Sequence, residues 1–293
     1  MRKTFAHETY KIMQKNGQVV VLLGDIGVFG FQDSFKTFPE RIFNVGILEQ
    51  TMIGMGAGLS SEGLIPVIHT IAPFITERAL EQIKIDFGYQ NLRGNLVSVG
   101  GSFDYAALGC THHCPGDVQT MLGVPNTEVY VPGTAKEFAY LFNKAFDNSK
   151  LSYFRLSEKV NRYSLEIEIG EPAIIQIGKK ATIVCVGPTL DLTLDVFTGL
   201  DVTIVYLTSL RPLSTEKLKA ITVSNNFLFI EPFYIGTTIQ ELFRNRHFVS
   251  GNYGFIGVPH DFIRKYGTRE EIEDYIGFNK TNIYQKYLEL INE

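Results

Sequence analysis

The stretch Asn44-VGILEQTMIGMGAGLSSEGLIPVIH-Thr70 contains a predicted helix, residues 46–59, followed by a predicted strand, residues 66–70. Further apolar, β-branched runs predict strands over residues 18–25, 95–100, 127–133 and 151–157. Helical patterns lie between them, including residues 74–90 and 134–146, and the second of these opens with a capping box of Thr134 and Glu137. Continuously apolar strands that alternate with helices predict an α/β fold with mainly parallel sheets.

A second series of strands and helices follows the first. Its strands are predicted over residues 180–187, 200–208, 226–231 and 253–259, and a charged helix follows Thr268. The segment between the two series is more polar, contains Gly170 and Pro172, and shows no clear periodicity. We therefore predict two consecutive α/β domains, residues 1–160 and 179–293, joined by a linker over residues 161–178 that contributes an edge strand.

Composition excludes several classes of protein. The chain has 27 Lys and Arg against 31 Asp and Glu, a net charge of −4, which disfavours nucleic acid and anionic membranes as partners. No apolar run reaches the about 18 residues that span a bilayer, and the N-terminus lacks the apolar core of a signal peptide. With only Cys110, Cys114 and Cys185, a disulfide framework is not expected. The sequence predicts a soluble, cytoplasmic protein.

Ligands of open parallel sheets bind outside the carboxyl ends of the strands. Residues 24–30, 69–74 and 100–114 fall there, and Glu49 stands at a predicted helix start. An acid in a first helical turn often serves only the helix dipole. Glu49, however, is the one acid in an otherwise apolar helix, so a functional role is an equal alternative.

The cluster Cys110-Thr-His-His-Cys114 has a spacing within reach of zinc-ligand patterns. No second cysteine pair exists, and Cys185 falls in a predicted buried strand, so we expect no metal held by this chain. Imidazoles that serve a substrate pocket, beside an inert thiol, are the favoured interpretation. The sequence also lacks the glycine-rich dinucleotide motif, the P-loop and the Gly-x-Ser-x-Gly elbow.

Residues 38–86 and 109–134, with their Gly-Ile-Leu-Glu-Gln and Thr-His motifs, resemble the pyrimidine-binding domain of transketolases. Residues 209–214, 229–232 and 257–267 resemble the C-terminal domain of that family. The Gly-Asp-Gly motif of the family's diphosphate-binding domain does not occur. The resemblance thus implies the C-terminal subunit of a split transketolase. It would bind thiamine diphosphate together with an N-terminal subunit that carries Gly-Asp-Gly and holds most of the Mg²⁺, in an α2β2 heterotetramer.

The resemblance also implies roles for single residues. Glu49 would hydrogen-bond N1′ of the aminopyrimidine and so activate the cofactor for transfer of a two-carbon ketol unit between sugars. Phe74 would stack on the pyrimidine, although a core phenylalanine is the alternative. Asp25 and Ile71 would lie near the cofactor. The residues implied for substrate are His69, His112, His113, Arg2 and Glu158, with His112 also assisting proton transfer.

Several positions depart from the family's pattern. Leu108 stands where the family has an acid that reads a sugar hydroxyl, and Glu158 stands where it has a phosphate-binding arginine. Gly100 and Phe29 fall near two other substrate positions, whereas Arg2 remains. These changes predict an acceptor that is neutral or carries its charge further out, as a nucleotide-linked sugar does. The beta subunit of a 2-oxo-acid dehydrogenase and a non-catalytic regulatory subunit of the same fold are the alternatives.

Overall fold

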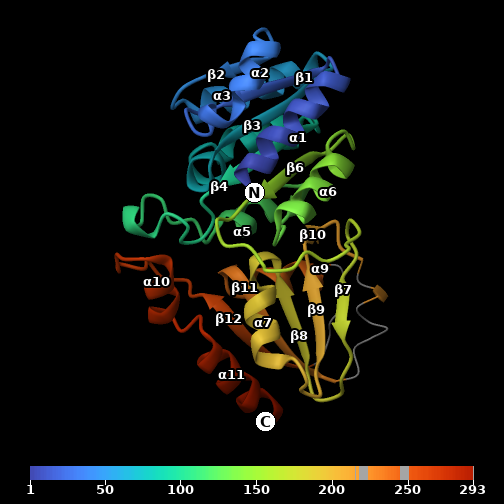
Figure 1. The fold of residues 1–293 in the computed structure, drawn as a ribbon, viewed down its shortest axis with the longest axis vertical. Coiled ribbons are helices and arrows are strands. Elements are labelled where there is room, and N and C mark those ends of the chain that lie inside the picture. Colours follow the sequence, from blue (N-terminus) through green and yellow to red (C-terminus); the bar gives the residue numbers. More distant parts are fainter. Residues whose placement is uncertain (215, 218–223, 245–250, 293) are drawn as a thin grey trace.

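A computed structural model describes residues 1–214, 216–217, 224–244 and 251–292. The chain forms two sheets, of seven and five strands, which lie one above the other with helices on their faces (Figure 1). Most neighbouring strands run parallel, which confirms the predicted α/β class. Among the described residues, no helix is both long and apolar enough to cross a membrane.

The first sheet contains every strand predicted before residue 160. In spatial order its strands are β10 (Ser209–Arg211), β5 (Thr127–Tyr130), β6 (Leu151–Arg155), β4 (Gly94–Val99), β3 (Ile65–Ile71), β1 (Val19–Leu23) and β2 (Ile42–Asn44). All pairs are parallel except β10 with β5. The central strands β1, β3 and β4 are buried along their whole length, as continuously apolar sequences require.

The helices of this half are α1 (Arg2–Lys15), α2 (Gln32–Thr37), α3 (Glu49–Ser61), α4 (Leu80–Gln82), α5 (Asp117–Leu122) and α6 (Ala135–Ala145), with 3₁₀ turns η1 (Val28–Phe31) and η4 (Ala106–Leu108). The capping box predicted at Thr134 is present at the start of α6. The helix predicted over residues 74–90 is not a single α-helix. Two π-helical segments, η2 (Phe74–Arg78) and η3 (Ile83–Tyr89), flank the short α4, and Ala79 breaks the helix with φ −106° and ψ 18°.

The second sheet has the order β12 (Asn252–Val258), β11 (Asn226–Tyr234), β8 (Thr182–Val186), β9 (Thr203–Leu207) and β7 (Ala173–Gln176). β7 is antiparallel to β9, and it is the edge strand expected in the linker. The elements that the structure describes in full in this half are the 3₁₀ turn η5 (Gly187–Thr189) and the helices α7 (Leu190–Phe197), α9 (Thr237–Arg244), α10 (Arg269–Tyr275) and α11 (Lys280–Asn292).

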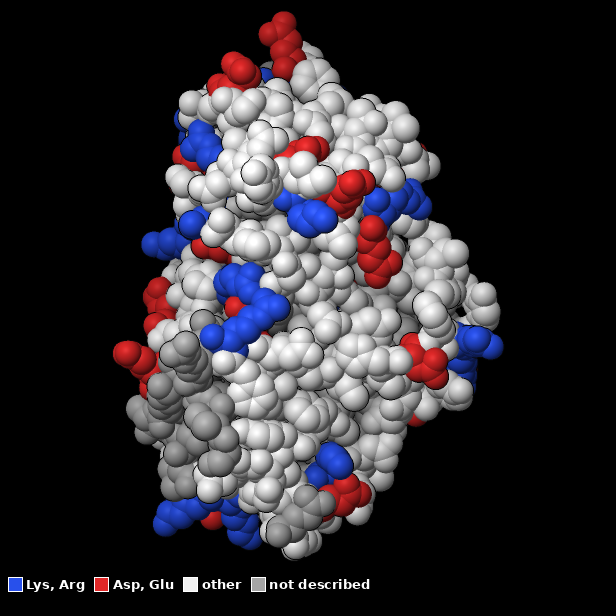
Figure 2. Space-filling view, turned by 180° about the vertical axis from the view of Figure 1, so that it is seen from behind, with Lys and Arg blue, Asp and Glu red and all other residues white. Residues whose placement is uncertain are grey.

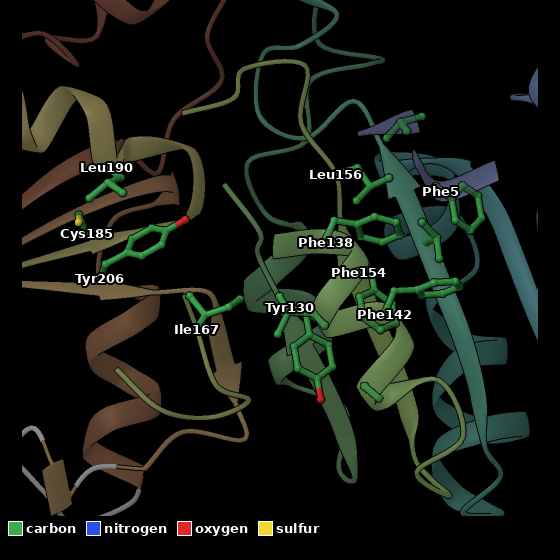
Figure 3. Close-up of a cluster of buried hydrophobic side chains, with 14 of the residues drawn as sticks. Phe5, Tyr130, Phe138, Phe142, Phe154, Leu156, Ile167, Cys185, Leu190 and Tyr206 are labelled. Carbon is green, nitrogen blue, oxygen red and sulfur yellow. The ribbon is translucent and has the colours of Figure 1, made fainter. Parts of the chain in front are cut away.

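The two halves share a core and a polar junction. Figure 3 shows Ile167 of the connecting segment between a group around Phe138 and Phe154 and a group around Leu190 and Tyr206. At the junction, the buried Arg155 guanidinium donates to Asp117 Oδ2 at 2.7 Å and to the carbonyl of Pro232 in β11 at 3.2 Å. A buried cation needs such partners, so this network ties the end of β6 and the start of α5 to the second sheet.

Candidate functional site

The carboxyl edge of the first sheet is hollowed by two adjoining cavities. The larger has a volume of about 820 Å³ and is lined by Asp25 after β1 and His69 of β3. The smaller, about 300 Å³, is lined by Glu158 after β6. Both are also lined by Arg2 and Lys3 at the start of α1. The topology thus brings together residues that lie far apart in the sequence, as the parallel sheet predicts.

His69 is buried, and its protonation state follows from its contacts. Nδ1 lies 2.7 Å from the carbonyl oxygen of Val97, which can only accept, so Nδ1 carries the proton. Burial lowers the pKa of the imidazole from 6.5 to about 4, so the ring is neutral near pH 7. Gly27, with φ +77°, lets the loop after β1 lie against the ring: a Cβ there would come within 2.8 Å of Nε2. Nε2 is therefore a hydrogen-bond acceptor at the cavity wall.

Asp25 lies at the turn after β1 in a left-handed conformation, with φ 62°. Its side chain is exposed, and its Oδ1 accepts a hydrogen bond of 3.1 Å from Asn44 Nδ2. Asn44 Oδ1 in turn accepts one of 3.0 Å from the backbone N–H of Asp25. Asn44 of β2 therefore holds the carboxylate at the cavity, a role that the sequence did not indicate.

Glu49 is the first residue of α3, and its side chain is only 1% exposed. Arg78 Nη1 donates to Glu49 Oε2 at 2.9 Å. Oε1 is also buried, and it has no hydrogen-bond partner among the residues that the structure describes. A buried carboxylate oxygen without a donor is costly, so Glu49 Oε1 is an acceptor that remains available to a ligand.

Phe74 is connected to this carboxylate through Arg78. It begins η2, and Arg78 ends it, so the two side chains lie on one face of the helical turn. The guanidinium of Arg78 lies over the Phe74 ring, 4.1 Å from its centroid. His112 packs edge-on against Phe74 at 5.3 Å between centroids, and Tyr105 packs against His112 at 6.3 Å. Phe74, His112 and Tyr105 thus form a row of aromatic side chains. The Tyr105 ring at its end packs against Gly100.

Ile71, at the end of β3, is buried and packs against Gly100. His113 lies elsewhere. Its Nε2 lies 3.1 Å from the carbonyl of Ala106, its ring packs edge-on against Phe103, and it lines a separate cavity of about 110 Å³ that Tyr234 of the second half also lines. The structure therefore brings Glu49, Phe74 and His112 together and places His113 away from them.

The remaining candidates differ in exposure. Arg2 and Glu158 are exposed, and the backbone N–H of Glu158 donates to Asp104 Oδ2 at 3.0 Å. Cys110 is exposed, whereas Cys114 and Cys185 are buried. Burial raises the pKa of the Cys114 thiol well above its usual value, which agrees with an inert thiol. In the described part of the chain, no three His, Cys, Asp or Glu side chains are grouped to hold a metal ion.

The face of the molecule in Figure 2 is largely uncharged, with Lys and Arg interspersed among Asp and Glu. No broad field of one sign appears on that face. This pattern offers no extended surface for a polyanion there.

Sequence reasoning missed Arg78 and Tyr105. For Arg78 a signal existed, because it stands four residues after Phe74 and such residues meet on a helix. For Tyr105 no signal existed, since its position depends on the path of a loop. Both adjoin residues that were predicted.

Comparison with known proteins identifies the family of this chain. Residues 1–162 match the family described as "Transketolase, pyrimidine binding domain". This chain belongs to the transketolase family. It is 36% identical over 265 residues to an "Uncharacterized 33.6 kDa protein in fasciation locus" of Rhodococcoides fascians, an alignment that covers 89% of this chain and 82% of the relative.

Two further relatives bear on how this transketolase-family chain is organised. It is 32% identical over 192 residues to one of the subunits of the apulose-4-phosphate transketolase of Actinobacillus succinogenes, with 62% of each chain covered. Its fold matches a solved structure titled "Split gene transketolase, inactive beta4 tetramer" with a TM-score of 0.84, at 24% identity, over 99% of this chain and 97% of that one. The resemblance to the C-terminal subunit of a split transketolase is thereby confirmed.

Proposed function

We propose that this chain is the C-terminal subunit of a heteromeric transketolase that transfers a two-carbon ketol unit from a ketose to an aldose with thiamine diphosphate. The observation that carries the proposal is the buried Glu49 carboxylate: its Oε1 lacks a partner among the described residues, and its Oε2 pairs with Arg78, which stacks on the Phe74 ring. A carboxylate in that setting suits a ring nitrogen that must gain and lose a proton.

The residues present fit the aminopyrimidine half of the cofactor. Glu49 would bind the ring nitrogen, Phe74 would stack on the ring, and Ile71 would border it. Thiamine diphosphate, when bound, supplies the carbon nucleophile that cleaves the ketose and carries its two-carbon fragment. The chain's own contribution is to hold a proton at Glu49, to orient the ring and to exclude water from it.

The substrate would extend from this point into the cavity beside His69. Neutral His69 offers Nε2 as an acceptor for a sugar hydroxyl. His112, half-buried between Phe74 and Tyr105, would contact substrate near the cofactor and assist proton transfer. Asp25 and Arg2 add one charge of each sign to the same cavity. His113, in its separate cavity, has no contact that supports a substrate role.

A second, N-terminal subunit would complete the site. The chain contains no Gly-Asp-Gly motif, so the diphosphate and Mg²⁺ would be held mainly by that subunit. The two residues before Glu49 have large apolar side chains that are exposed: Ile47 is 66% exposed and Leu48 55%. Exposed apolar residues beside a buried functional carboxylate support docking of the N-terminal subunit over the site, in an α2β2 complex.

Reconstitution tests the proposal. The purified chain alone should show no ketol transfer with thiamine diphosphate and Mg²⁺, and activity should appear when an N-terminal subunit with Gly-Asp-Gly is added. Ketol transfer by the isolated chain would contradict partner dependence. Decarboxylation of a 2-oxo acid by the pair would identify a 2-oxo-acid dehydrogenase subunit instead. Absence of cofactor binding by the pair would leave the regulatory alternative.

A further inference from the structure

The Arg78 guanidinium makes the two contacts that the proposed function assigns to the aminopyrimidine. Its Nη1 donates to Glu49 Oε2 at 2.9 Å, and its Cζ lies 4.1 Å from the centroid of the Phe74 ring. A guanidinium is planar, conjugated and rich in N–H donors, so it can stack on an aromatic face and bond a carboxylate at once. An aminopyrimidine bound between Glu49 and Phe74 would use the same two surfaces.

The exposure of the pair shows which side chain lies outermost. The Glu49 side chain is 1% exposed, whereas that of Arg78 is 40% exposed. A ring that arrives from solvent therefore meets Arg78 before it meets the carboxylate. Because one guanidinium makes both contacts, rotation of the Arg78 side chain alone releases Glu49 and the face of Phe74 together.

We propose that Arg78 is an internal placeholder for the aminopyrimidine. Its side chain occupies the position between Glu49 and Phe74 and turns outward when the cofactor enters. This inference rests on the proposed function. The placeholder has a physical reason, since a buried carboxylate without a cation is strongly destabilising. Arg78 compensates the charge of Glu49 until the cofactor replaces it.

The placeholder also limits the contacts open to the cofactor. Arg78 holds Glu49 Oε2 and covers one face of the Phe74 ring, so an aminopyrimidine that stacks on that face needs Arg78 to leave. The cofactor must compete with an internal group, and the apparent affinity falls accordingly.

The test measures the Kd of thiamine diphosphate for the assembled complex by calorimetry. Arg78→Met keeps an apolar stem but removes the guanidinium, and it should bind the cofactor about tenfold more tightly, the worth of the contact that the cofactor no longer displaces. Arg78→Lys keeps a cation for Glu49 but has no planar face, so it should show a smaller gain. Arg93→Met is the control, because Arg93 pairs with Asp147 away from the site; its Kd should equal that of the wild type.

A crystal structure of the cofactor-loaded complex gives a second readout, in which Arg78 should have turned away from Phe74. Weaker or unchanged binding in both Arg78 variants, with normal binding by the wild type, would overturn the placeholder and leave the proposed function intact. No cofactor binding by the wild-type complex would overturn both. If Arg78→Met does not assemble, Arg78→Lys decides, because Glu49 keeps its counterion.

Discussion

Two buried glutamates, Glu49 in the first half of the molecule and Glu231 in the second, differ in their hydrogen bonds. Glu231 of β11 is fully bonded: its oxygens accept from the backbone N–H of Gly236 at 2.5 Å and of Thr238 at 2.9 Å. Glu49 has one oxygen paired with Arg78 and one without a partner among the described residues. Burial of an acid is thus no sign of function. What distinguishes Glu49 is the unused acceptor beside an exposed cation and an aromatic ring.

The largest expected difference between the two glutamates is catalytic. Glu49→Gln keeps the size but cannot exchange a proton with the ring nitrogen, so the assembled enzyme should lose at least about 10²–10⁴-fold in kcat. Exchange of the cofactor's C2 proton, followed by NMR in the complex, measures the step directly. Glu231→Gln is the matched control, and its folded fraction should keep wild-type exchange. Wild-type exchange in Glu49→Gln would make Glu49 a structural residue.

The pH dependence of stability should also separate the halves. Burial raises the pKa of Glu231 from 4.5 to about 7, so between these values the folded form holds a proton that the unfolded form has lost, and stability falls as pH rises. For His69, with its pKa lowered from 6.5 to about 4, the unfolded form holds the extra proton, and stability rises with pH over that range. Each group contributes about 3 kcal/mol across its range.

Two variants of the full chain separate these opposed slopes. In urea titrations between pH 4.5 and 6.5, Glu231→Gln should leave a free energy of unfolding that rises with pH. His69→Asn, which keeps a donor for Val97, should leave one that falls. Identical pH profiles of unfolding free energy for the two variants would contradict the opposite pKa shifts of Glu231 and His69.

At fixed pH the loss of stability should be larger for Glu231→Gln than for Glu49→Gln. In Glu231→Gln, the amide NH₂ faces a backbone donor that loses its acceptor, which should cost about 1–3 kcal/mol of unfolding free energy. Glu49→Gln removes a charge but leaves an amide oxygen that can accept from Arg78, so its loss should be smaller. The urea midpoints of the two variants, compared at pH 7, test this order.

The smallest effect concerns the carboxyl edge of the first sheet, where Glu158 faces the cavity that Arg2 lines. An acid there repels a phosphate by about 1 kcal/mol at 4 Å in water, so Glu158→Arg should shift kcat/KM toward a phosphorylated acceptor by about tenfold. The measurement compares matched phosphorylated and unphosphorylated acceptors in the assembled enzyme. A strong preference of the wild type for the phosphorylated acceptor would contradict the predicted neutral one.

Most of this architecture follows from local sequence. Apolar runs become strands because burial on both faces suits them, and the capping box at Thr134 fixes the start of α6. The three-residue strands β2 and β10 carry too little pattern to predict, and they form because longer neighbours offer free edges. The split of residues 74–90 into π-helical turns was also unpredictable from periodicity. So was the pairing of Arg78 with Glu49, which depends on tertiary contact.

One short strand has a consequence for how this protein can be divided. β10, residues 209–211, belongs by sequence to the second half but closes the edge of the first sheet against β5. A cut after residue 160 would leave β5 with an open edge, and open edges promote aggregation. It would also remove the Pro232 carbonyl from Arg155. A division of the gene that preserves folding should therefore keep the two sheets on one chain.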